Sequence, residues 1–133
     1  MIRRMNPDTV REVPDAFRGI YTHAVELSAP QRLVFVSGQI GVAPDGRTAP
    51  TFEAQCHQAM DNVEAILTAA ELSTQDILKV TYYLTSAGHL AALGAIRRER
   101  WFDAEHAPAV TTLVVSELAE PDLQIEIEVT AGR

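Results

Sequence analysis

The sequence has little cysteine, a shortage of basic charge and no long apolar run, and each of these excludes a class of protein. Cys56 is the only cysteine among 133 residues, so neither an internal disulfide nor a cysteine-based zinc site can form. Against 18 Asp and Glu there are 11 Lys and Arg, a formal net charge of −7, which argues against nucleic-acid binding by bulk electrostatics. No apolar run approaches the roughly 20 residues that span a bilayer, so no membrane segment is expected.

The N-terminal segment has Arg3 and Arg4 but no apolar stretch after them. A secretory signal is therefore not expected, and we expect a cytoplasmic protein. The chain has the length of one domain, which we predict over residues 1–133. Residues 1–14 precede the first ordered pattern and are expected to be loosely ordered.

Two segments with helical spacing of apolar residues lie between strand-like segments. Residues 52–70 carry apolar side chains at i, i+4, i+7 and i+8, which predicts an amphipathic helix with Thr51 as its N-cap. A second helix is predicted over about 88–104. Its apolar face also contains Arg97, an unusual position for a cation. The apolar residues of that face are Leu90, Leu93, Ile96 and Trp101.

Segments rich in β-branched residues or in alternating polar and apolar residues predict the strands. The resulting order, β-β-α-β-α-β-β with a possible further N-terminal strand, predicts an α+β fold with both helices on one face of the sheet. The opposite sheet face then has no cover within the chain, which predicts an oligomer. The predicted strands are 20–27, 33–42, 77–84, 110–118 and 123–130.

Six segments resemble, in their order and spacing, the RidA/YjgF family of reactive intermediate deaminases. They are Y-T-H-A-V at 21–25, V-S-G-Q-I at 36–40, Q-A-M-D-N-V-E-A-I-L at 58–67, D-I-L-K-V-T-Y-Y-L at 76–84, P-A-V-T-T-L-V-V-S-E-L at 108–118 and I-E-I-E-V-T-A at 125–131. The resemblance implies a chorismate-mutase-like fold with a mixed six-stranded sheet. It also implies a homotrimer with sites between subunits, and hydrolysis of imines or enamines with release of ammonia, without a metal or an organic cofactor.

The resemblance also assigns roles to individual residues. Glu126 corresponds to the glutamate that positions water, and we treat it as the catalytic candidate. Val110 stands where the family has the arginine that binds the substrate carboxylate, and a valine offers no hydrogen-bond donor in its place. The candidate substrate-binding residues are Tyr21, Ser37, Gly38, Gly94, Val110, Thr111, Thr112 and Arg97.

The missing arginine leaves two interpretations open. In one, another cation holds the substrate, with Arg97 as the first candidate and Arg98 as the second. In the other, Arg97 only extends past Trp101 to solvent. Cys56 lies on the apolar face of the first helix, which predicts a buried, unreactive thiol.

Three functions therefore remain to be compared. The first is an imine or enamine deaminase with a specialised small-molecule substrate. The second is a trimer of the same family that binds small metabolites, or acts as a scaffold, without catalysis. The third, an endoribonuclease, is disfavoured by the net charge of −7 and by the lack of a histidine pair or basic stripe.

Overall fold

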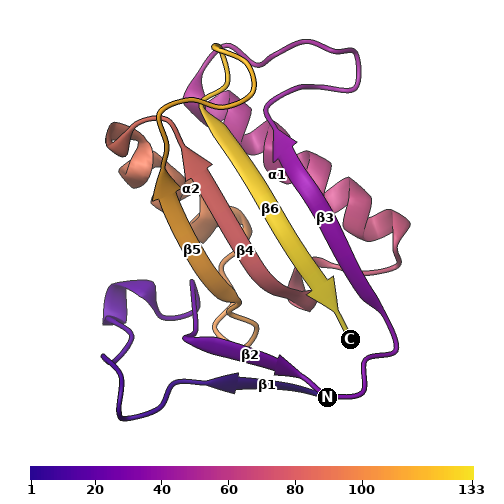
Figure 1. Ribbon diagram of the computed structural model, residues 1–133, viewed down its shortest axis with the longest axis vertical. Coiled ribbons are helices and arrows are strands. Elements are labelled where there is room, and N and C mark those ends of the chain that lie inside the picture. Colours follow the sequence, from indigo (N-terminus) through magenta and orange to yellow (C-terminus); the bar gives the residue numbers. More distant parts are fainter.

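Four strands form the main sheet in the order β3-β6-β4-β5, and both helices cover one face of it (Figure 1). The computed structural model describes all residues, 1–133. Strand β5 runs parallel to β4, and the other neighbours are antiparallel, so the sheet is mixed. The elements are β3 (Leu33–Ile40), α1 (Phe52–Ala69), β4 (Ile77–Leu84), α2 (Leu90–Arg100), β5 (Ala109–Val114) and β6 (Ile125–Gly132).

Two further strands form a separate antiparallel ribbon, β1 (Ile2–Met5) with β2 (Ala24–Leu27). One parallel bridge between Thr22 and Ala109 links the approach to β2 with the start of β5. The predicted α+β fold with two helices on one sheet face is confirmed, with its six strands divided between the main sheet and this ribbon. Within the segment 1–14, which was expected to be loosely ordered, residues 2–5 form strand β1 and pair with β2.

Strand β5 ends four residues before its predicted end at residue 118. The N–H of Val115 donates to the carbonyl of Leu84, the last residue of β4. Beyond that point β4 has no backbone left to pair with, because the chain turns into the 3-10 helix η3 (Ala87–His89). An edge strand without a partner cannot continue the ladder, however β-branched its residues are.

Helix α1 matches its prediction closely, and α2 is shorter than predicted. The hydroxyl oxygen of Thr51 accepts from the N–H of Ala54 and caps α1 as expected. The region expected to open the second helix forms η3 instead, where the Ser86 side chain accepts from the N–H of Gly88. A serine at this position supplies a local cap that competes with a continuous helix.

The hydrophobic core lies between the helices and the inner sheet face. Alternate residues of β6 (Ile125, Ile127 and Val129) are buried there. The intervening Glu126 and Glu128 therefore belong to the outer face, which neither helix covers. On this outer face the side chain of Phe35 pairs across to Thr130 and is 76% exposed.

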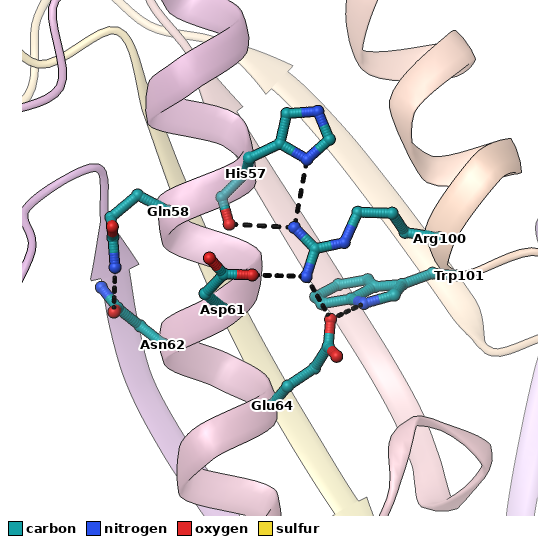
Figure 2. A network of polar contacts seen from close by, with 7 residues as sticks. All are labelled: His57, Gln58, Asp61, Asn62, Glu64, Arg100 and Trp101. Atoms are coloured by element: carbon teal, nitrogen blue, oxygen red, sulfur yellow. Dashed lines mark hydrogen bonds and ion pairs between the residues drawn. The ribbon is translucent and has the colours of Figure 1, made fainter.

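A charged cluster joins the two helices at the edge of the core (Figure 2). Arg100 of α2 donates to the carbonyl of His57 and to the carboxylates of Asp61 and Glu64, at 3.0, 2.6 and 2.7 Å. The indole N–H of Trp101 donates to the same Glu64 carboxylate. Burial opposes the charge of Arg100, but the two carboxylates outweigh it and raise its pKa. The cluster thus fixes the C-terminal end of α2 against the middle of α1.

Neither helix combines the length and the apolar character that crossing a membrane requires.

Candidate functional site: an arginine-lined cavity and a carboxylate on the opposite sheet face

A cavity of about 590 Å³ lies between α2, the edge strand β5 and the segment that precedes β2. Val110 and Thr112 reach it from β5, because residues two apart on a strand share a face. Val110 pairs with the buried Val80, so this face is the one that the helices cover. The predicted site residues that line the cavity are Tyr21, Gly94, Arg97, Val110 and Thr112, together with Arg98.

Aromatic rings form one wall of the cavity. The rings of Phe17 and Tyr21 are tilted at 48° with centroids 6.1 Å apart. Phe17 is the last residue of the 3-10 helix η1 (Asp15–Phe17). Arg11 and Pro14, which precede this helix, also line the cavity. None of these three residues was predicted to belong to the site, because the segment around them carries no periodic pattern that would place it against α2.

The electrostatics of the cavity contrast with those of the whole chain. Three arginines (Arg11, Arg97 and Arg98) line it, and none of its lining residues is acidic, although the chain has a net charge of −7. Burial lowers the pKa of Arg97, while the nearby Tyr82 raises it. A guanidinium remains charged at any physiological pH, so the cavity is a local positive region in an acidic protein.

The catalytic candidate Glu126 lies on the other face of the sheet. It pairs with Tyr83 of β4 and Ile40 of β3, and its neighbours along β6 point into the core. Its side chain lies directly over Gly38, because a Cβ built on Gly38 would be 2.6 Å from the carboxyl carbon of Glu126. A residue with any side chain at position 38 would displace the carboxylate.

The residues around Glu126 are in part those predicted from the sequence. The ladder between β3 and β6 is irregular between Val36 and Gln39, which is where Ser37 and Gly38 lie, and Ser37 is exposed. Thr111 points away from the cavity, and its hydroxyl accepts from the ammonium of Lys79. Because side chains alternate between the two faces of a sheet along a strand, Thr111 lies on the opposite face from Val110 and Thr112.

The predicted site residues therefore form two groups on opposite faces of one sheet. Tyr21, Gly94, Arg97, Val110 and Thr112 surround the cavity, and Ser37, Gly38, Thr111 and Glu126 lie outside it. A single chain does not bring Glu126 together with the cavity.

The cysteine of the chain is enclosed in the core, as its place on the apolar helix face predicted. Cys56 is fully buried, and burial raises the pKa of its thiol to about 12. A protonated, inaccessible thiol is neither a nucleophile nor a metal ligand. The structure also contains no group of three or more His, Cys, Asp or Glu side chains with the geometry of a metal site.

Comparison with known proteins gives consistent matches along the chain. The family model described as endoribonuclease L-PSP matches residues 13–132. The 2-iminobutanoate/2-iminopropanoate deaminase of Salmonella typhimurium is 35% identical over 132 residues, which covers 97% of this chain and 99% of that protein.

Solved structures agree with this match. The crystal structure of YyfB from Yersinia pestis, a conserved Rid family protein of unknown function, has a TM-score of 0.82 at 28% identity and covers 99% of this chain and 98% of that one. E. coli TdcF with bound serine has a TM-score of 0.70 at 33% identity and covers 85% of this chain and 87% of that one. The chain therefore belongs to the RidA/YjgF family.

Proposed function

We propose that the protein is a deaminase that hydrolyses a small reactive imine, or the enamine in equilibrium with it, and releases ammonia. Relatives of the chain carry this activity in their names, among them the Salmonella 2-iminobutanoate/2-iminopropanoate deaminase. Family membership alone leaves the reaction open, because one fold hosts many functions. The proposal therefore depends on the chemistry that the residues offer.

The observation that carries the proposal is the position of Glu126 over Gly38 on an uncovered sheet face. Its carboxylate has no hydrogen-bond donor within the chain to neutralise it, and it is half-buried. Such a group can accept a proton from water while the water oxygen bonds to the carbon of the C=N group. The nitrogen takes up protons, the C–N bond breaks, and ammonia and a carbonyl compound leave. General-base catalysis of this kind contributes typically 10²–10⁴-fold.

We further propose that the site is completed between subunits of a homotrimer. Because the sheet separates Glu126 from the arginine-lined cavity, the two can face one ligand only if the cavity of one subunit meets the Glu126 of the partner subunit. The outer sheet face is suited to such a contact, since no helix covers it and it exposes Leu33, Phe35 and Leu113. Exposed apolar patches of this kind are typical of interfaces.

The family resemblance places a carboxylate-binding arginine at position 110, where this chain has a valine, so a substrate carboxylate would have to be held by another residue. Val110 lies in the cavity wall and donates nothing to a ligand. A hydrogen bond to a charged group contributes roughly 1.5–3 kcal/mol. We therefore expect slow turnover of simple 2-imino acids if no other residue replaces the lost contact.

The test is imine hydrolysis with matched glutamate variants. Imines are generated in situ from amino acids, with small, acidic and apolar side chains in turn, and ammonia release is followed. Glu126→Gln is expected to lower the rate at least about a hundredfold. Glu128→Gln, two residues along the same strand and on the same face, is expected to retain the rate. No rate above background with any imine, or equal rates for wild type and Glu126→Gln, would refute the proposal.

The second candidate function is a non-catalytic metabolite-binding or scaffold trimer, and Val110 is the observation that favours it. A ligand that binds to wild type and Glu126→Gln alike, without any detectable turnover, would establish this alternative. The endoribonuclease function in the description of the family model receives no comparable support, because the net charge of −7 opposes binding of a phosphate backbone.

A further inference from the structure

Arg97 is the one arginine of α2 whose side chain has neither a carboxylate nor a carbonyl as partner. Its Nε is buried without a partner, and its guanidinium carbon lies 5.6 Å from the centroid of the Tyr82 ring. The neutral phenol of Tyr82 is its neighbour in the core, and it does not balance the charge of the guanidinium. The other two arginines of the helix are engaged. Arg98 donates to the carbonyl of Ala16 at 2.6 Å, and Arg100 binds the α1 carboxylates.

Such an arrangement costs stability unless something else binds to it. A buried donor without an acceptor loses its hydration and gains nothing in exchange, and the penalty is larger when the group is charged. The lowered pKa of Arg97 has the same origin in burial. A helix position between the buried Leu93 and the core-contacting Trp101 would be filled at less cost by an apolar residue.

The surroundings of Arg97 match an organic anion. Arg97 borders the cavity of about 590 Å³ that has three arginines and no acid in its lining. One turn before it, Gly94 leaves its side of the cavity open, since a Cβ there would meet only Arg98, at 3.5 Å. The apolar side chains of Phe17, Leu90 and Val110 lie in the same wall. The cavity thus offers a fork of donors beside an apolar surface.

We propose that Arg97 binds the carboxylate of the ligand and thereby replaces the arginine that Val110 lacks. The ligand class is a small 2-imino acid, or the 2-keto acid that its hydrolysis yields, with an apolar side chain against the cavity wall. The identity of the reacting group rests on the proposed function, whereas the anion site rests on Arg97 and its cavity alone. Arg98 also contributes positive charge to the cavity, but one of its guanidinium nitrogens donates to the carbonyl of Ala16 and holds the side chain in place.

The test uses a probe pair of nearly equal shape, 2-oxobutanoate and its neutral amide, with the full-length protein. Arg97→Met is expected to weaken 2-oxobutanoate binding about ten- to a hundredfold, the range for a lost charge-assisted hydrogen bond. Binding of the amide is expected to change less than about twofold. Arg47→Met, which removes the same charge from an exposed turn, is the matched control and is expected to leave both affinities unchanged.

Thermal stability separates a binding role from a structural one. Because Arg97 has no acidic partner in the chain and its Nε is buried without an acceptor, Arg97→Met is expected to have the same Tm as wild type or a higher one without ligand. Arg97→Lys keeps the charge but loses the planar guanidinium. Its affinity for 2-oxobutanoate is expected to lie between those of wild type and Arg97→Met. An unchanged affinity of Arg97→Met for 2-oxobutanoate, or a clearly lowered Tm, would overturn the assignment.

Failure of this assignment and failure of the proposed function give different results. If imines are hydrolysed but 2-oxobutanoate binds Arg97→Met as tightly as wild type, the deaminase stands and the role of Arg97 is wrong. If no imine is hydrolysed but 2-oxobutanoate still requires Arg97, the anion site stands and the deaminase is wrong.

Discussion

Gly41 lies so close to helix α1 that no side chain fits at this position. A Cβ built there would be 2.6 Å from the Cα of Gln55, and backbone of a packed helix cannot yield as a flexible side chain can. Gly41→Ala is therefore expected to lower the free energy of unfolding by about 1–3 kcal/mol, the typical cost of overpacking. Urea denaturation measures the change. Gly88→Ala is the control, because its Cβ would meet only the Ser86 hydroxyl at 3.3 Å, and equal midpoints for the two variants would contradict the argument.

The thiol of Cys56 offers a second test at the level of a single residue. Its pKa rises from an ordinary value of 9.0 to about 12 because the side chain is buried. At pH 8 the thiolate fraction is then about a thousandfold lower than in the unfolded chain, and only the thiolate reacts. Alkylation by iodoacetamide is expected to be at least about a thousandfold slower in the native protein than in urea. Rapid labelling of the native state would show that the core opens readily.

Single residues show where prediction from sequence succeeds and where it stops. The burial of Cys56 follows from helical spacing alone, and the structure confirms it. The burial of Gln55 does not, because its side chain is held by the carbonyls of Ala49 and Asp122 and by the N–H of Gln124. Those partners lie in two loops, one of them distant in sequence. No local pattern signals that a polar side chain will find them.

Among the elements, the contact between α1 and α2 depends most on one side chain, Arg100 (Figure 2). Its guanidinium is largely buried and bonds to His57, Asp61 and Glu64. Arg100→Met keeps the apolar stem but leaves two carboxylates without their cation. We expect a loss of about 1–3 kcal/mol in the free energy of unfolding, measured in urea. Arg47→Met removes a cation from an exposed ion pair and is expected to lower the free energy of unfolding by less than about 0.5 kcal/mol. A similar loss for both variants would contradict the role given to Arg100 in joining the helices.

Element boundaries deviate from prediction where the neighbouring element ends. The β-branched run from 110 to 118 predicts a long strand, but β5 stops when β4 turns away after Leu84. Leu90 was expected on the buried face of the second helix, yet it is 45% exposed and borders the cavity. Periodicity identifies which residues are apolar on a helix face. It does not show that part of that face borders a cavity instead of the core.

For the whole molecule, the candidate site could be named from the sequence but not assembled. Family resemblance places Tyr21, Val110 and Glu126 in one site, whereas the alternation of strand faces in a single chain separates Glu126 from the other two. The sequence could supply the residue types. The resemblance implied a site between subunits, and the register of the sheet supports this proposal, because it puts Glu126 and the cavity on opposite faces of one chain.

That contact is testable through Phe35, whose side chain is 76% exposed on the uncovered sheet face. Light scattering is expected to give three times the protomer mass of 14.6 kDa for the wild type. Phe35→Asp places a charge in the proposed interface and is expected to shift the mass to one protomer. Its circular dichroism should be unchanged, since the residue is solvated within one chain. Val10→Asp, at an exposed apolar residue of the N-terminal loop, should leave the assembly intact.

The same variant tests whether the assembly is needed for activity. If Glu126 serves the cavity of the neighbouring subunit, Phe35→Asp is expected to lose both the trimer and the hydrolysis of imines. Full activity in a monomer would show that one chain suffices.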